Sequence, residues 1–174
     1  MRITANGIAV NDQLDGPAGA PVVTLAHSLA ATSDLWDAQV RALSGRYRVL
    51  RYDARGHGGS DVPPGPYTLA HMAEDLIGLL DALGIAETHA VGLSMRGCTA
   101  MTAALAFPHR IRSLVLADTT SRYAPETARM GADRIRVAET AGMEPIVEPT
   151  LRIWFTERAL VPFLDRVTSA EAVR

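Results

Sequence analysis

Strand-like and helix-like segments alternate along most of this sequence, and the alternation limits the folds open to it. Four short apolar runs are typical of strands: 21–26, 47–52, 88–93 and 111–117. Three segments with helical spacing of apolar residues separate them: 34–43, 68–84 and 95–107. Strands joined through helices are usually parallel neighbours. The pattern therefore predicts an α/β fold, with a mainly parallel sheet and helices on both of its faces.

The ends of these segments carry local signals. Residues 2–10, with Asn6-Gly7 in the middle, predict a hairpin before the parallel strands. Ser33 and Thr68 are predicted to begin the first two helices, with Ser33 as an N-cap. Reactive groups in such sheets gather at the carboxyl ends of the strands. Four polar residues fall at these ends: His27, Asp53, Ser94 and Asp118.

Composition excludes several classes of function. The 174 residues are 48% hydrophobic and 21% charged, as in a folded globular protein. A net charge of −2 gives no reason to expect nucleic acid or a membrane surface as a partner. Cys98 is the single cysteine, and the N-terminus has no signal-peptide pattern, so we expect a cytoplasmic protein without disulfides. No metal-ligand cluster or phosphate-binding loop occurs, so we expect neither a metal nor a cofactor.

The segment Ala90–Gly97 places a serine between a strand and a helix. On such a sharp turn the hydroxyl is exposed, and backbone N–H groups point toward the atom that it attacks. Ser94 is therefore the predicted nucleophile, with the Met95 N–H as one oxyanion donor. The second donor should come from the loop after the strand at 21–26, where Leu29 is the choice and Ser28 the alternative. A serine that only caps the helix is the competing interpretation.

Three motifs together resemble the α/β-hydrolase fold family: His27-Ser28-Leu29, the Gly-rich turn at 53–60, and Gly92-Leu93-Ser94-Met95. Within that family, the G-L-S-M sequence, Trp36 and the segment 154–156 are similar to 3-oxoadipate enol-lactonases and related carboxylesterases and cofactor-free haloperoxidases. The resemblance implies a serine hydrolase that acts on a small carboxylic ester or lactone through a Ser94 acyl-enzyme. A haloperoxidase or perhydrolase activity is the alternative.

The resemblance also implies a division of the chain. Residues 1–122 correspond to a hydrolase core without its last strands. Residues 123–174 correspond to part of a helical lid, with helices expected at 129–140 and 149–167. Family members carry their acid and histidine after the lid, and no β-like run follows here. A truncated, split or degenerate hydrolase with little activity alone is therefore the second interpretation, its partner a second copy or a complementary C-terminal fragment.

Few residues already present can replace the missing acid and base. Asp118 stands where some relatives place the acid, although it also suits a loop-capping role. His27 adjoins the oxyanion loop, so it is considered as a base and as a substrate contact, and its main expected role is to fix the loop. Trp154 in the lid segment is the other expected substrate contact. Asp53 and Arg55 are expected to brace the Gly-rich turn.

Arg96 departs from the G-x-S-x-G pattern, which has a glycine two positions after the serine. Because the elbow helix packs close to neighbouring backbone, we expect this side chain to point outward or to open the turn. Either change would displace the nucleophile and lower the rate. An Arg96→Gly variant should then turn over faster.

Overall fold

The structure describes residues 1–160 of the chain. This computed structural model divides into two compact units, Met1–Ser121 and a second unit that begins at Arg122. Within the described residues, every helix is too short or too polar to span a lipid bilayer.

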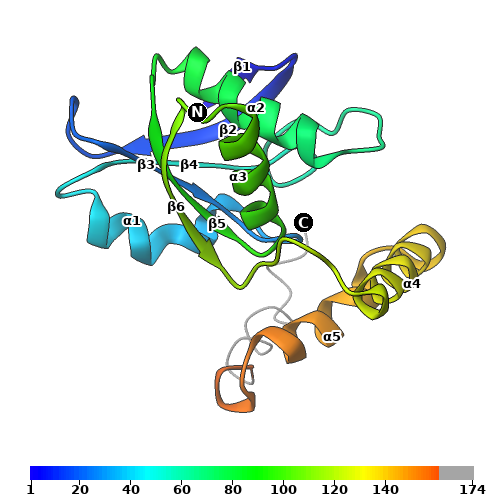
Figure 1. The fold of residues 1–174 in the computed structure, drawn as a ribbon. Coiled ribbons are helices and arrows are strands. Elements are labelled where there is room, and N and C mark those ends of the chain that lie inside the picture. Colours follow the sequence, from blue (N-terminus) through cyan, green and yellow to red (C-terminus); the bar gives the residue numbers. More distant parts are fainter. Residues whose placement is uncertain (161–174) are drawn as a thin grey trace. The chain divides into compact units, whose positions relative to one another are not determined.

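A six-stranded sheet forms the centre of the first unit, with the order β1-β2-β4-β3-β5-β6 (Figure 1). Its strands are β1 (Arg2–Ala5), β2 (Ile8–Asp15), β3 (Val22–Ala26), β4 (Arg48–Tyr52), β5 (Thr88–Leu93) and β6 (Ile111–Ala117). β1 and β2 form the predicted hairpin, and β2 also pairs antiparallel with β4. The pairs β4–β3, β3–β5 and β5–β6 are parallel, which confirms the predicted mainly parallel sheet.

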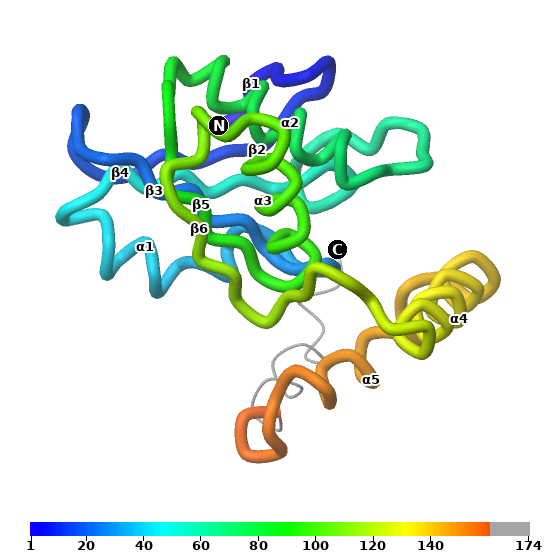
Figure 2. Tube along the Cα trace, in the orientation of Figure 1, coloured from blue at the N-terminus to red at the C-terminus, as the bar shows by residue number. Residues whose placement is uncertain are grey.

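Helices cover both faces of this sheet, also as predicted. The 3₁₀ turn η1 (Ser33–Trp36) and α1 (Asp37–Leu43) lie on one face, and α2 (Leu69–Ala82) and α3 (Met95–Ala106) lie on the other (Figures 1 and 2). Two apolar clusters result. The smaller one contains Val23, Leu25, Trp36, Val40 and Val49. The larger one includes Leu50, Leu76, Leu79, Leu80 and Ala103. Burial of these side chains is the main force that holds the helices on the sheet.

The two predicted helix starts have different outcomes. Thr68 caps α2 as expected, because its side chain accepts a hydrogen bond from the His71 N–H at 3.1 Å. The N-cap prediction for Ser33 is wrong, because Thr32 precedes the 3₁₀ turn and no side chain caps it. Ser33 instead donates its backbone N–H to Asp53 Oδ1 at 2.8 Å. A carboxylate from a distant turn therefore accepts the hydrogen bond from a backbone N–H at the start of this 3₁₀ turn, where a local capping side chain was expected.

The strand registers bring the predicted functional edge together. Ala26 of β3 pairs with Tyr52 of β4 and with Gly92 of β5, and Leu93 pairs with Ala117 of β6. The residues that come next in each strand are His27, Asp53, Ser94 and Asp118. Four segments that are distant in sequence therefore leave the sheet at the same edge.

The second unit, in its described part, contains α4 (Pro125–Ala141) and α5 (Glu144–Trp154). α4 begins four residues before the predicted helix at 129–140, because Pro125 suits the first turn of a helix. α5 differs more from the prediction of 149–167: it begins at Glu144, contains Pro149 in its interior and ends at Trp154. Positions 161–167 lie outside the described residues. The assignment of this unit as part of a lid stays a prediction.

Candidate active site

Ser94 connects β5 to α3 in a strained backbone conformation, with φ of 55° and ψ of −123°. Non-glycine residues rarely adopt positive φ, and they do so where the surroundings impose it, often at functional sites. Ser94 occupies the N-cap position of α3, but its side chain makes no capping hydrogen bond. The interpretation of Ser94 as a capping serine therefore does not match the structure.

Backbone contacts with the end of β6 support this conformation. The Ser94 N–H donates to the Ala117 carbonyl oxygen at 2.9 Å, and the Thr119 hydroxyl donates to the Ser94 carbonyl oxygen at 2.7 Å. The Gly97 N–H donates to the same oxygen at 2.9 Å. Thr119 is a residue that the sequence reasoning missed, since a threonine two residues after a strand carries no distinctive signal.

Two glycines allow the turn to close. A Cβ at Gly92 would lie 2.5 Å from the Arg96 carbonyl oxygen, and a Cβ at Gly97 would lie 2.5 Å from Thr119 Cγ2. Neither distance is compatible with a side chain. The small residues that this turn requires are therefore Gly92 and Gly97, two positions before and three positions after Ser94.

Arg96 is the clearest correction to the sequence analysis. Its side chain neither points outward nor opens the turn, and the residue is 0% exposed on the inner side of α3. One nitrogen, Nη1, lies 2.7 Å from Met72 Sδ on α2, while Nε and Nη2 have no hydrogen-bond partner among residues 1–160. Burial lowers the pKa of this guanidinium, with Tyr52 and Asp75 opposing the shift. At about 100° per residue, position 96 faces the inner side of α3, where the unbranched Met72 leaves room for it.

The predicted oxyanion donors come from α3 and from the loop after β3. The Met95 N–H belongs to the first turn of α3, whose donors have no partner within the helix. Leu29 is 48% exposed, and its N–H has no hydrogen-bond partner among the described residues. Ser28 is buried, and its carbonyl oxygen accepts from the Ala31 N–H and faces the His27 ring. The Ser28 N–H also has no hydrogen-bond partner among the described residues, so the choice of Leu29 over Ser28 as second donor stays a prediction.

His27 is fully buried, and both of its ring nitrogens are bonded within the protein. Nδ1 lies 2.8 Å from the Ser28 carbonyl oxygen, and Nε2 accepts the Ala54 N–H at 3.0 Å. Burial is the main cause that lowers the pKa of His27 to about 4. In this arrangement the ring fixes the loop, the main role expected for it, and it presents no free nitrogen to Ser94 or to a substrate.

Asp53 and Arg55 brace the Gly-rich turn, as expected. The Asp53 carboxylate accepts hydrogen bonds from the backbone N–H groups of Ser33 and Gly59 and from the Asn11 side chain, at 2.8 to 2.9 Å. Burial raises the pKa of Asp53, but these hydrogen bonds outweigh it and leave the pKa below its usual value. The carboxylate also fills the space beside Gly58, where a Cβ could not fit.

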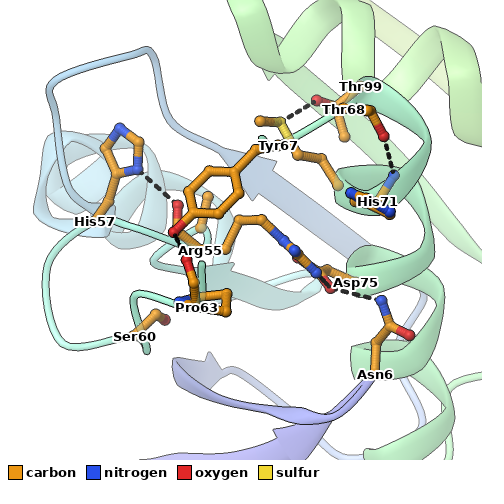
Figure 3. A network of polar contacts seen from close by, with 12 residues as sticks. Asn6, Arg55, His57, Ser60, Pro63, Tyr67, Thr68, His71, Asp75 and Thr99 are labelled. Atoms are coloured by element: carbon orange, nitrogen blue, oxygen red, sulfur yellow. Dashed lines mark hydrogen bonds and ion pairs between the residues drawn. The ribbon is translucent and has the colours of Figure 1, made fainter. Parts of the chain in front are cut away.

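The Arg55 guanidinium points to Asp75 of α2 and forms two hydrogen bonds with it, of 2.5 and 2.6 Å (Figure 3). Asn6 donates to the same carboxylate at 2.8 Å. The hydrogen bonds to Asp75 are the main cause that raises the pKa of Arg55. A paired arginine of this kind ties the turn to α2 and stays charged at every physiological pH.

The remaining predicted residues lie apart from this network. Asp118 is exposed directly after β6, with φ of 44°. Its role as an acid stays a prediction, because both ring nitrogens of His27 and of His57 are already bonded to backbone groups. Trp154 ends α5 in the second unit and is 44% exposed, and its contact with substrate also stays a prediction. Within residues 1–160, no three His, Cys, Asp or Glu side chains gather as a metal site requires.

A hollow of about 610 Å³ lies at the opposite edge of the sheet. It is lined by the amino ends of β3 to β6, and Pro21, Thr88 and Arg112 are among its residues. Ser94 does not contribute to it. We therefore assign the candidate chemistry to the elbow edge on the basis of its geometry and give this hollow no part in it.

Comparison with known proteins identifies the family. The family model described as the alpha/beta hydrolase fold matches residues 21–136, which include the whole elbow. The chain belongs to the α/β-hydrolase fold family.

Relatives within the α/β-hydrolase family extend the comparison. The chain is 32% identical over 154 residues to 3-oxoadipate enol-lactonase 2 of Acinetobacter baylyi, an alignment that covers 88% of this chain and 57% of that protein. It is 39% identical over 135 residues to the putative carbamate hydrolase RutD of Caulobacter vibrioides, covering 76% and 50%. The chain thus spans little more than half the length of these curated relatives.

Solved structures give the same result for the fold. The enol-lactonase from Burkholderia xenovorans LB400 superposes with a TM-score of 0.86 at 36% identity, covering 96% of this chain and 63% of that one. A thermophilic esterase from Thermogutta terrifontis superposes with a TM-score of 0.80 at 31% identity, covering 87% and 58%. These relatives are hydrolases, which supports a hydrolase role for the chain.

Proposed function

We propose that this chain carries the nucleophile and the oxyanion site of a serine hydrolase for small carboxylic esters or lactones. The observation that carries the proposal is the backbone of Ser94, strained at φ of 55° between β5 and α3, with a hydroxyl that makes no capping hydrogen bond. Presentation of the hydroxyl at the end of a helix explains that strain.

In the proposed reaction, Ser94 Oγ bonds to the carbonyl carbon of the substrate as its proton passes to a base. The carbonyl electrons move onto oxygen, and the resulting oxyanion accepts hydrogen bonds from the N–H groups of Met95 and Leu29. Collapse of this intermediate expels the alkoxide or enolate and leaves an acyl-Ser94 ester. Attack of water on that ester then releases the acid and restores the serine.

The relatives supply the substrate class. Two enol-lactonases, one compared by sequence and one by structure, cover most of this chain, so a lactone similar to 3-oxoadipate enol-lactone is the proposed substrate. Carbamate and ester hydrolysis, named for other relatives, pass through the same kind of tetrahedral intermediate. The elbow chemistry does not discriminate among them. Comparative turnover of enol-lactone, ester and carbamate would do so.

A second candidate function is a chain with little activity alone, which depends on another polypeptide for its base. His27 and His57 favour this candidate, because each has both ring nitrogens engaged by backbone groups. A missing general base typically lowers the rate by about 10² to 10⁴-fold.

A serine-directed fluorophosphonate tests both candidates on the purified chain, with and without added imidazole as an external base. We expect slow formation of an adduct on Ser94, with a rate that rises with the concentration of neutral imidazole. Ser94→Ala should abolish the adduct. Ser113→Ala is the matched control, because Ser113 Oγ lies 2.8 Å from His89 Nδ1 but is not on an elbow.

The outcomes separate the candidates. Rapid labelling of Ser94 without imidazole would contradict the second candidate and establish an internal base. Absence of a Ser94 adduct at every imidazole concentration would refute the assignment of Ser94. Equal labelling in the Ser94→Ala variant would place the reactive group elsewhere.

A further inference from the structure

Two histidines connect the oxyanion loop (27–31) to the Gly-rich turn (53–60). His27 belongs to the loop, and its Nε2 accepts the N–H of Ala54 in the turn at 3.0 Å. His57 belongs to the turn, and its Nε2 accepts the N–H of Ala30 in the loop at 3.3 Å. The two ring centroids are 5.2 Å apart. Each segment therefore supplies the acceptor for a backbone N–H of the other.

The remaining nitrogen of each ring faces a carbonyl oxygen of its own segment. Nδ1 of His27 lies 2.8 Å from the Ser28 oxygen, and Nδ1 of His57 lies 3.0 Å from the Arg55 oxygen (Figure 3 shows the latter). A carbonyl oxygen only accepts and a backbone N–H only donates. One state of each ring satisfies both neighbours: the neutral tautomer with hydrogen on Nδ1 and a lone pair on Nε2.

We propose that His27 and His57 are positioning residues of the oxyanion loop, and that both rings act only as neutral Nδ1–H imidazoles. Protonation of His57 then releases the Ala30 N–H and displaces the adjacent Leu29 N–H. The inference rests on the proposed function in one respect, the identity of residues 27–31 as the oxyanion loop. A second proton on Nε2 would face the Ala30 N–H, so two donors would oppose each other where a hydrogen bond had been. Loss of the oxyanion donor in acid would then be separate from titration of any catalytic base.

The hydrogen bond from the Ala30 N–H to His57 constrains the loop backbone at Ala30. This residue has φ of 60°, a conformation that alanine adopts only when its neighbours impose it. It directly follows Leu29, whose N–H is the proposed oxyanion donor. Release of the Ala30 N–H would let this residue return to negative φ. That rotation would turn the peptide between Leu29 and Ala30, and the Leu29 backbone that carries the oxyanion N–H is attached directly to this peptide.

The groups around the two rings shift the pKa of the imidazoles in both directions. Burial is the main cause that lowers the pKa of His27 and of His57. The buried guanidinium of Arg96 lowers both further, and the Asp53 carboxylate opposes it. His27 also feels the His57 ring. His57 is the half-buried ring of the two, so it is the one that we expect to take up a proton first.

Arg96 therefore affects the oxyanion loop through its charge. Its charge lies close enough to both rings to disfavour their protonated forms. Replacement by methionine removes the charge, keeps an unbranched side chain and should raise the pKa of both imidazoles.

Nitrogen-15 NMR of the imidazole rings of the purified chain tests the proposal without any need for turnover. At neutral pH we expect both rings to give the signature of the Nδ1–H tautomer. As His57 titrates, the protection factor of the Ala30 amide against hydrogen exchange should fall about fivefold, the equivalent of one net hydrogen bond. A His57→Phe variant should show this lowered protection at every pH, and His71→Phe, which alters an exposed ring on α2, should not.

Three results would overturn the inference: an Nε2–H tautomer, a charged ring at neutral pH, or unchanged Ala30 protection in a folded His57→Phe protein. If that variant does not fold, the titration of the wild-type chain decides by itself whether Ala30 protection follows His57. Fluorophosphonate labelling of Ser94 is measured separately. Failure of labelling with the expected NMR result would count against the proposed function alone.

Discussion

Replacement of Arg96 by methionine should make the first unit more stable. Arg96 is 0% exposed, and its Nε and Nη2 have no hydrogen-bond partner in the part of the chain that the structure describes. A buried unsatisfied donor costs about 1–3 kcal/mol. Methionine is shorter than arginine, but it is also unbranched and has no polar group, and it would place a thioether beside Met72. Taking the lower figure for each of the two nitrogens, we expect the free energy of unfolding to rise by about 2 kcal/mol.

Urea denaturation followed by the fluorescence of Trp36 measures this change. The chain has two tryptophans, so both proteins would carry Trp154→Phe to restrict the signal to the first unit, where Trp36 is buried. The midpoint should rise with an unchanged slope, since the surface exposed on unfolding is nearly the same. A thermal midpoint about 4–8 °C higher would correspond to this increase.

Arg41→Met is the matched control, because Arg41 is exposed on α1 and its replacement should change stability by no more than about 0.5 kcal/mol. A less stable Arg96→Met protein would refute the reasoning. It would mean that the guanidinium has a compensating interaction, such as attraction to Asp75, that exceeds the cost of its unpaired nitrogens.

Three further changes test other parts of the site. Gly97→Ala should lower the free energy of unfolding, measured in urea, by about 1–3 kcal/mol, because its Cβ would clash with Thr119. Adding Thr119→Ala should restore part of this loss. Unchanged stability of the single variant would contradict the close approach of Gly97 to Thr119. Arg55→Met should lower the free energy of unfolding by about 3–5 kcal/mol, because it leaves the Asp75 carboxylate buried without a counter-charge. A loss below about 1 kcal/mol would show that the ion pair is dispensable. The pKa of His27 in the folded protein, about 4, lies below its unfolded value of 6.5, so the free energy of unfolding should fall by about 3 kcal/mol as the pH drops from above 6.5 to about 4. Urea denaturation at several pH values measures this change. A flat profile would mean that the ring is not buried as a neutral imidazole.

Much of the fold could be predicted because its signals are local. Apolar runs of strand length and helical spacing place β3 to β6, α2 and α3 within a residue or two. The same patterns place Ser94 at a strand-to-helix junction. The N-cap prediction for Ser33 was wrong because a distant carboxylate, that of Asp53, accepts the hydrogen bond from its backbone N–H. The predicted start of α5 was also wrong, since the helix begins five residues before it.

The sequence by itself determined the order of strands and helices and the position of Ser94, because periodicity and turn propensity act over a few neighbouring residues. Tertiary structure decided the state of the residues around it. Arg96 turns inward because Met72, 24 positions earlier, leaves space on α2, and Ala30 is bonded by His57 from 27 positions later. Thr119 supports Ser94 across 25 positions. Contacts at such separations depend on how the sheet brings its strand ends together, which no local pattern specifies.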